Sequence, residues 1–244
     1  MDNFNKYWYF QNLISSEDCD RIIKLGNSKK LETAVTYDND EKCDDNRISQ
    51  SELTKSQLKD KNIDIKNTYV RDSDVTWLDD DWLYELICPK VREANMKSGW
   101  KYDIDTFESI QFTKYNSPTG FYGWHLDSAG DWHAVNQRYI PGISPDVKTK
   151  NGKLPGKWTT DDNIIGKVRK LSITINLSDE SDYEGGLLKF DYGQHSDTQF
   201  HTCNEIKPKG SMIVFPSYTY HCVTPVTKGT RYSLVMWCLG RPFK

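Results

Sequence analysis

A chain of 244 residues with 36% hydrophobic content is long enough to fold as one sizeable domain, or at most two small ones. The eight tryptophans and fourteen tyrosines argue against a disordered chain, although 27% of the residues are charged. A net charge of −3 gives no reason to expect nucleic acid or an anionic membrane as a partner.

The N-terminal sequence and the cysteines indicate the compartment. Residues 1–10 lack the basic region and apolar core of a signal peptide, and no segment is apolar enough to cross a bilayer. The six cysteines are scattered along the chain without a CxxC pair. We therefore expect reduced thiols in a cytoplasmic protein, rather than a disulfide framework or a zinc site.

The first third of the chain predicts helices with a few strands. A first helix is expected to begin at residues 15–18, where serines precede acidic residues, and to end at Gly26. A second helix is expected to begin near residues 79–81 and to end at Gly99, with a kink or a break at Pro89.

Beyond residue 108 the hydrophobic period changes from helical to two. Apolar and polar residues alternate over 110–115, 171–177 and 231–238, which predicts three strands. Short strands joined by glycine turns favour a mainly β, α+β protein whose helices support a double-sheet jelly roll, the architecture also used by cupins. The predicted turns are Gly185-Gly186, Lys209-Gly210 and Lys228-Gly229.

The most informative residues of the β region are His125, Asp127, His221 and Arg231. Strand residues i and i+2 point to the same face, so His125 and Asp127 can hold one metal ion, with His221 as a third ligand from another strand. Three protein ligands on one face leave the other face open, which is the geometry of non-haem Fe(II) oxygenases. Cys222 would point to the opposite face of its strand and is not expected to be a ligand.

Arg231 is expected to begin the last strand and to point into the barrel together with Ser233. A buried arginine is costly unless it is paired, and a cosubstrate carboxylate held by its bidentate fork would offset that cost. The alternative is a salt bridge to a protein Asp or Glu, or exposure of the side chain at the start of the strand.

Two stretches are predicted to be irregular. Residues 38–62 are rich in Asp, Asn, Lys and Ser, which is typical of an exposed, mobile connection. Residues 131–170 carry eight Lys or Arg against four Asp and directly follow the first two candidate ligands. A loop of this length is usually functional or disordered, so we predict a lid over the site. Trp132, Tyr139 and Trp158 favour a packed lid over the alternative, a solvated insert without a role.

The chain resembles the Fe(II)/2-oxoglutarate-dependent dioxygenases, in their prolyl 4-hydroxylase-like branch, over most of its length. This resemblance implies a single domain over residues 1–244, with a helical support region in 1–105 and a distorted double-stranded β-helix in 106–244. The segments that carry it are RDSDVTWLDDDWLYELI at 71–87, REANMKSGWKYDIDTFESIQFTKY at 92–115, RKLSITINLSDESDYEGGLLKF at 169–190, KGSMIVFPSYTYHCVTPV at 209–226 and GTRYSLVMW at 229–237.

Residue by residue, the resemblance implies that the iron ligands are His125, Asp127 and His221. It also implies that Arg231 binds the distal carboxylate of 2-oxoglutarate and that Ser233 assists. The implied cofactors and cosubstrates are Fe(II), 2-oxoglutarate and dioxygen, with ascorbate as a further candidate.

Further contacts are implied around these residues. Tyr115 stands where the family often has a tyrosine near the cosubstrate, and Asn176 stands where some relatives have a tyrosine that contacts 2-oxoglutarate. Tyr122 matches an active-site tyrosine of some prolyl hydroxylases, and Trp237 resembles an aromatic residue on the substrate side. Core packing is the alternative role of Tyr122, Asn176 and Trp237.

The implied reaction hydroxylates an unactivated C–H bond and releases succinate and carbon dioxide. Asp127 favours hydroxylation, because halogenating members of the family have a small residue in place of the carboxylate. The leading substrate is a proline in a peptide or protein segment. Collagen-type members usually have lysine where this chain has Arg231, which favours a segment other than collagen.

Several other functions stay open. A free amino acid or another small molecule is a second candidate substrate, which a basic lid would suit. A nucleic-acid demethylase is disfavoured, because Trp237 stands where that branch commonly has a second arginine. A zinc hydrolase could use the same three ligands but would leave Arg231 and Ser233 without a function. A non-catalytic, cupin-like binding module would make the whole set coincidental. No oligomeric state is predicted.

Overall fold

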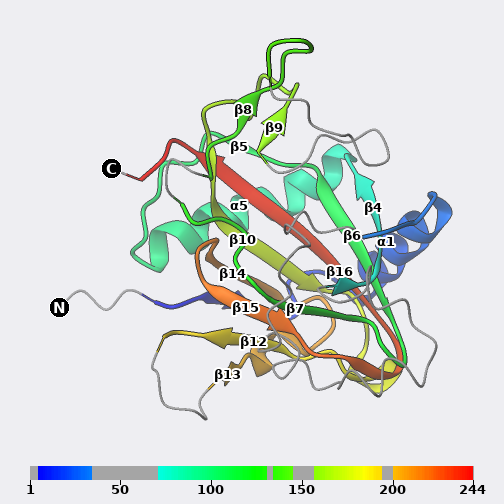
Figure 1. The fold of residues 1–244 in the computed structure, drawn as a ribbon. Helices are drawn as coiled ribbons and strands as arrows, with labels where there is room; N and C mark the ends of the chain where they lie inside the picture. Colours follow the sequence, from blue (N-terminus) through cyan, green and yellow to red (C-terminus); the bar gives the residue numbers. More distant parts are fainter. Residues whose placement is uncertain (1–4, 35–70, 131–133, 145–156, 194–199, 244) are drawn as a thin grey trace.

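The computed structural model describes residues 5–34, 71–130, 134–144, 157–193 and 200–243, and most of its strands form two antiparallel sheets (Figure 1). The strands of the larger sheet are β1 (Trp8–Phe10), β2 (Glu32–Thr33), β4 (Asp74–Leu78), β5 (Thr106–Phe107), β6 (Ile110–Asn116), β10 (Val168–Asn176), β11 (Tyr183–Gly185), β14 (Met212–Pro216) and β16 (Val226–Gly240). Seven of them follow the order β1-β14-β10-β16-β6-β4-β2, and both β5 and β11 also pair with β16.

The smaller sheet faces the larger one (Figure 1). Its strands are β3 (Arg71–Asp72), β7 (Phe121–His125), β12 (Leu188–Asp191), β13 (His201–Thr202) and β15 (Tyr220–Val223), in the order β13-β12-β15-β7-β3. The arrangement confirms the predicted mainly β architecture of two sheets with supporting helices. The three strands predicted from alternation correspond to β6, β10 and β16.

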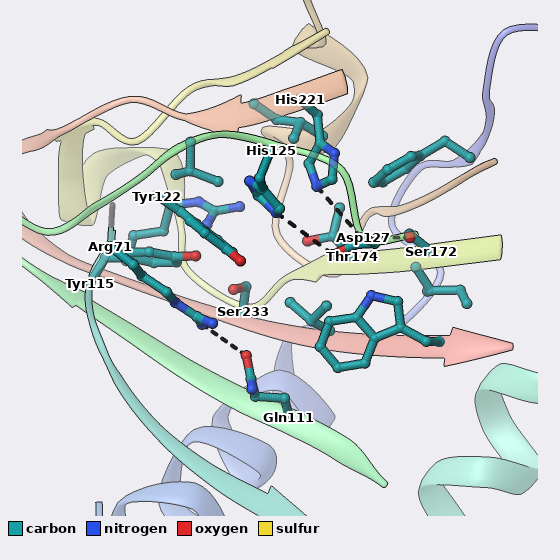
Figure 2. A pocket seen from close by; sticks show the side chains of 17 residues that line it. Arg71, Gln111, Tyr115, Tyr122, His125, Asp127, Ser172, Thr174, His221 and Ser233 are labelled. Carbon is teal, nitrogen blue, oxygen red and sulfur yellow. Dashed lines mark hydrogen bonds and ion pairs between the residues drawn. The ribbon is translucent and has the colours of Figure 1, made fainter. Parts of the chain in front are cut away.

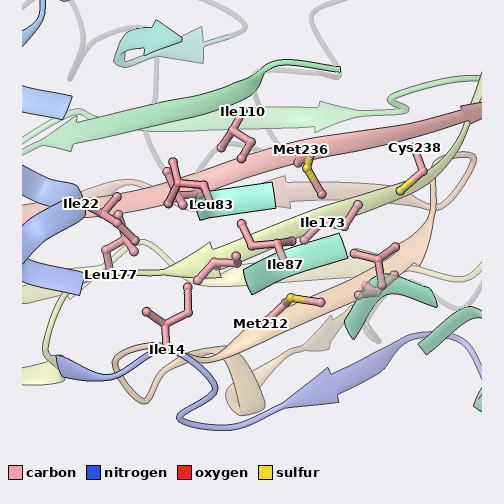
Figure 3. Packing of buried hydrophobic residues seen from close by; sticks show 14 of the residues in the cluster. Ile14, Ile22, Leu83, Ile87, Ile110, Ile173, Leu177, Met212, Met236 and Cys238 are labelled. Carbon is pink, nitrogen blue, oxygen red and sulfur yellow. The ribbon is translucent and has the colours of Figure 1, made fainter. Parts of the chain in front are cut away.

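Alternation along β10 separates the hydrophobic core from the space between the sheets. Leu171, Ile173 and Ile175 are buried in the main hydrophobic cluster, whereas Ser172 and Thr174 line a pocket on the other side. Two helices, α1 (Ser16–Ser28) and α5 (Asp81–Lys97), contribute to this cluster against the larger sheet. Figure 3 shows its members, among them Ile22 of α1, Leu83 and Ile87 of α5, Met212 of β14 and Met236 of β16.

Helix α1 begins where the sequence predicts but ends later. The backbone N–H of Asp18 donates to Ser15 Oγ at 3.0 Å, which caps the first turn. The helix continues past Gly26 to Ser28, so the predicted end at Gly26 is wrong. Gly26 is buried inside the helix, and a Cβ added there would lie 2.5 Å from the ring of Phe112. The absence of a side chain at Gly26 therefore allows α1 to pack closely against β6.

Replacement of Gly26 by alanine is expected to lower the free energy of unfolding. Forcing a methyl group against the buried Phe112 ring should cost about 1–3 kcal/mol. A gain of about 1 kcal/mol in helix propensity offsets only part of that cost. Urea unfolding measures the difference, with the exposed Asn27→Ala on the same helix as the control. A Gly26→Ala protein as stable as the parent would show that the ring moves aside freely.

Two further expectations, a break in helix α5 and a turn at Gly229, differ from the structure. α5 ends just before Gly99, as predicted, but it continues through Pro89, so the helix is not broken at this proline. Gly229 lies inside β16 with a φ of +71°, and an added Cβ would overlap the carbonyl oxygen of Asp182. The turn predicted at Lys228-Gly229 is therefore wrong, because this glycine lets β11 approach β16.

The insert predicted over 131–170 contains some regular structure. β8 (Gln137–Arg138) and β9 (Trp158–Thr159) form a short parallel pair that projects from the sheets at the top of Figure 1. β10 already begins at Val168, so the insert is shorter than predicted. None of its described residues lines the pocket between the sheets, and the lid stays a prediction. Trp132 and residues 38–62 lie outside the described residues.

Candidate active site

Two strands of the smaller sheet place the two candidate histidines side by side. β7 and β15 are antiparallel and pair His125 with His221 in register. Directly opposed residues share a face, so both imidazoles leave the sheet on the same side, with ring centroids 4.2 Å apart. Asp127 lies two residues beyond the end of β7, and not on the strand as predicted. Its backbone N–H donates to Ser217 O at 3.1 Å, which fixes the turn beside the histidines.

The donor atoms of His125, Asp127 and His221 converge (Figure 2). They lie within 4.8 Å of one another, and no other described residues form such a group of three. His125 Nε2 lies 3.6 Å from Asp127 Oδ1, and His221 Nε2 lies 3.6 Å from Oδ2. These distances are too long for hydrogen bonds and suit donors that share one ion at about 2.0–2.2 Å.

Both imidazoles are held in the orientation that a metal ligand needs. His125 Nδ1 lies 2.8 Å from Gly123 O, and His221 Nδ1 lies 2.9 Å from Thr219 O. A carbonyl accepts only from a protonated Nδ1, so the lone pair of each ring stands on Nε2. Burial, together with the nearby His125, lowers the pKa of His221 to about 4, which keeps its ring neutral at pH 7.

A serine hydroxyl from the opposite sheet holds the carboxylate. Ser172 Oγ of β10 donates to Asp127 Oδ2 at 2.6 Å and lies 3.0 Å from Ser217 Oγ. Burial alone would raise the pKa of Asp127, but its interactions with His221 and His125 hold that pKa well below the usual range. The site therefore offers two imidazole nitrogens and one ionised carboxylate, a donor set that fits Fe(II).

The three donors line one pocket with side chains from both sheets (Figure 2). The larger sheet contributes β6, β10, β14 and β16, and the smaller sheet contributes β3, β7, β12 and β15. Most of the residues predicted to bind cosubstrate or substrate meet there. Besides the three donors, the polar and aromatic lining consists of Arg71, Gln111, Tyr115, Tyr122, Ser172, Thr174, Phe215, Arg231, Ser233 and Trp237.

Arg231 is a buried cation in this pocket. It is 2% exposed, and no carboxylate among the described residues pairs with it. It stands opposite Tyr115 in the β6–β16 register, with its guanidinium carbon 5.6 Å from the centre of that ring. Ser233 lines the same wall. Within the described residues, Arg231 therefore neither forms a salt bridge to a protein carboxylate nor is exposed at a strand end. A carboxylate ligand would supply the missing counter-charge.

Tyr122 and Trp237 both line the pocket, as expected for residues on the substrate side. The ring of Tyr122 stacks on His125 at a centroid distance of 3.6 Å, and burial raises the pKa of its phenol to about 12. Trp237 Nε1 is buried and has no hydrogen-bond partner in the described structure. A buried N–H without an acceptor is costly, so it suits a bound ligand.

Asn176 is the last residue of β10. It is 0% exposed, but it does not line the pocket. Its side-chain amide donates to Ser178 O at 2.9 Å and to Lys207 O at 2.7 Å. These bonds tie the end of β10 to a neighbouring turn. These contacts favour the alternative, structural role of Asn176, and its contact with 2-oxoglutarate stays a prediction.

Several residues of the pocket were not predicted from the sequence. Arg71 and Gln111 line it from β3 and β6, and Ser172 holds the carboxylate from β10. Glu108 and Arg169 lie just outside: Arg169 donates to both oxygens of Glu108 at 2.6 Å, and its guanidinium lies 3.8 Å from the centre of the Trp237 ring. Alternation could have placed Ser172 and Gln111 on one face of their strands, but no local signal marked Arg71.

Residues 110–239 match the family model of the 2OG-Fe(II) oxygenase superfamily, which is more than half of the chain. The chain belongs to this superfamily. The match runs from β6 to β16 and includes all three donors and Arg231. It confirms the superfamily that the sequence segments indicate. Membership implies Fe(II), 2-oxoglutarate and dioxygen, in agreement with the donor set.

Curated relatives of this oxygenase are PKHD-type hydroxylases. The chain is 45% identical over 81 residues to Syncc9605_1577 of Synechococcus sp. (strain CC9605), which is 33% of this chain and 34% of the relative. It is 41% identical over 136 residues to YbiX of Escherichia coli O9:H4 (strain HS), which is 54% of this chain and 43% of the relative. The chain thus spans less than half the length of these curated relatives.

Solved structures with the same fold include prolyl hydroxylases. The viral collagen prolyl hydroxylase vCPH from Paramecium Bursaria Chlorella virus-1 superposes with a TM-score of 0.54 and 19% identity, over 97% of both chains. The Trichoplax adhaerens prolyl hydroxylase, solved with a hypoxia inducible factor peptide fragment, gives a TM-score of 0.58 and 14% identity over 97% of this chain and 84% of that chain. The likeness shows the shared fold. The described part of this oxygenase has no helix long and apolar enough to span a membrane.

Proposed function

We propose that this chain is an Fe(II)- and 2-oxoglutarate-dependent dioxygenase that hydroxylates a proline in a peptide or protein segment. One observation carries the proposal: three converging donors and the buried Arg231, which lacks a carboxylate partner among the described residues, line the same pocket. A zinc hydrolase would use the donors but would give the buried guanidinium no role, and a non-catalytic binding module would leave both the donors and the guanidinium without a role.

The residues of the pocket divide the work. His125, Asp127 and His221 would hold the iron, which with 2-oxoglutarate supplies the oxidising chemistry when bound. Arg231 would orient the distal carboxylate of the cosubstrate through a bidentate pair, with Ser233 beside it. Apolar walls exclude water from the pocket, and they include Leu188, Phe215 and Val223.

The choice of proline is supported by relatives and by the fold. PKHD-type hydroxylases are among the curated relatives, and prolyl hydroxylases are among the structures with this fold. A small molecule that carries a carboxylate is the second candidate substrate. It is favoured by Arg71, a second buried cation of the pocket that has no carboxylate partner among the described residues.

An anaerobic titration of the metal-free protein with Fe(II) and 2-oxoglutarate tests the cofactor site. We expect a weak visible charge-transfer band that requires both components and disappears in His221→Ala. The matched control is His201→Ala, an exposed histidine that contacts Tyr7 outside the pocket, and it should keep the band. Metal binding without any band would contradict the 2-oxoglutarate assignment and favour the hydrolase.

A further inference from the structure

Arg71 is a second buried arginine in the pocket. It is 7% exposed and belongs to β3, on the sheet opposite to that of Arg231. Its Nε donates to Ser73 Oγ and its Nη2 donates to Gln111 Oε1, both at 2.8 Å. These acceptors are neutral, and Nη1 has no partner among the described residues. The hydrogen bonds orient the guanidinium but do not neutralise it.

Stacked rings connect this guanidinium to the metal donors. Its central carbon lies 4.5 Å from the centre of the Tyr122 ring, and that ring stacks on His125. Figure 2 shows Arg71 beneath Tyr122, with its end directed toward Gln111. A group bound to Arg71 would therefore be separated from the metal ligand His125 only by the Tyr122 ring. A small molecule, or two adjacent residues of a peptide, could span that separation.

The charges in the pocket call for one more anion. Asp127 is the one carboxylate that lines the pocket within the described structure, and both arginines line it as well. If Fe(II) and doubly charged 2-oxoglutarate bind as proposed above, one positive charge still has no counterpart. Charges buried in a protein are paired or coordinated, because an unpaired one loses much of its hydration. Trp237 Nε1, the buried donor without a partner, adds a second unsatisfied polar group to the same lining.

We propose that Arg71 forms a substrate subsite that binds a carboxylate close to the carbon that is hydroxylated. The inference rests on the proposed function, since it assigns 2-oxoglutarate to Arg231. The carboxylate can come from a free amino acid or from an acidic side chain next to the target residue in a peptide. Ser73 and Gln111 are positioning residues, because they hold the guanidinium in place and do not themselves bind the carboxylate.

Calorimetric titrations under anaerobic conditions test the subsite on the protein loaded with Fe(II) and 2-oxoglutarate. Two matched pairs of probes differ only in charge: N-acetyl-L-proline against N-acetyl-L-prolinamide, and acetyl-Ala-Pro-Glu-amide against acetyl-Ala-Pro-Gln-amide. We expect at least about tenfold tighter binding of the acidic member in one pair, as for a charge-assisted hydrogen bond. The pair that discriminates identifies the source of the carboxylate.

Variants of Arg71 should remove this discrimination selectively. In Arg71→Gln the two members of the pair should bind equally, while the 2-oxoglutarate band persists and shows that the site is folded. Arg71→Lys keeps the charge without the fork and should retain part of the preference. The matched control is Arg92→Gln, which changes an exposed arginine of α5 away from the pocket and should leave the preference intact.

Two results would overturn the subsite. One is equal affinity, or no binding, of both members in both pairs by the wild-type protein. The other is a preference that survives in Arg71→Gln. Failure of the proposed function would look different, because the wild-type protein would then give no 2-oxoglutarate band at all.

Discussion

Asp127→Ala should abolish both Fe(II) binding and 2-oxoglutarate turnover while the fold persists. Asp127 supplies one of three converging donors, and it is the carboxylate that two histidines and Ser172 surround. Loss of residues that merely support metal ligands typically costs about 10–100-fold in affinity or activity. Loss of a ligand itself should cost more. Metal titration calorimetry and succinate release measure the two effects.

Two further aspartate variants sharpen this experiment. Asp127→Asn keeps an oxygen for the Ser172 hydroxyl but loses the charge, so it should bind metal more weakly than the parent and better than Asp127→Ala. Asp105→Ala removes an exposed carboxylate and should behave as the parent. Circular dichroism confirms that each variant is folded. Parental turnover in Asp127→Ala would remove this residue from the metal site.

Arg231→Ala is expected to raise the 2-oxoglutarate concentration for half-maximal turnover without weakening Fe(II) binding. The guanidinium is 2% exposed and has no carboxylate partner among the residues described, so a bound carboxylate would depend on it. Truncating one partner of a buried, hydrogen-bonded charge pair costs about 2–5 kcal/mol. That cost corresponds to roughly 30-fold to a few thousand-fold in affinity.

A conservative variant separates charge from geometry at this position. Arg231→Lys keeps the charge but cannot form the bidentate fork, so its requirement for 2-oxoglutarate should lie between those of the parent and Arg231→Ala. Arg92→Ala, which changes an exposed arginine of α5 outside the pocket, is the control for a surface arginine. An unchanged dependence on 2-oxoglutarate in Arg231→Ala would exclude this residue from the cosubstrate site.

Much of the fold could be predicted because local patterns report which face of an element is buried. The alternation of Leu171, Ile173 and Ile175 with polar residues fixed both the strand and its apolar face. Capping by Ser15 located the start of α1 for a similar local reason. Elements whose structure depends on sequence-adjacent residues were therefore the ones that the sequence predicted well.

Expectations failed where a distant neighbour decides the local structure. Gly26 was expected to end a helix, but the ring of Phe112 from β6 occupies the space that a Cβ would need. Gly229 was expected to make a turn, but the carbonyl of Asp182 approaches it within a strand pairing. In both cases the glycine permits close contact between elements that lie far apart in the sequence.

By itself, the sequence determined the donor types, their spacing and an arginine in the last strand, because His125, Asp127, His221 and Arg231 are recognisable by chemistry and order. The tertiary structure alone decided which other side chains share their pocket. It placed Arg71 there and kept Asn176 out. The physical reason is that pocket membership depends on sheet pairing and strand register, which join residues from distant segments, whereas a one-dimensional pattern reports only periodicity within a segment.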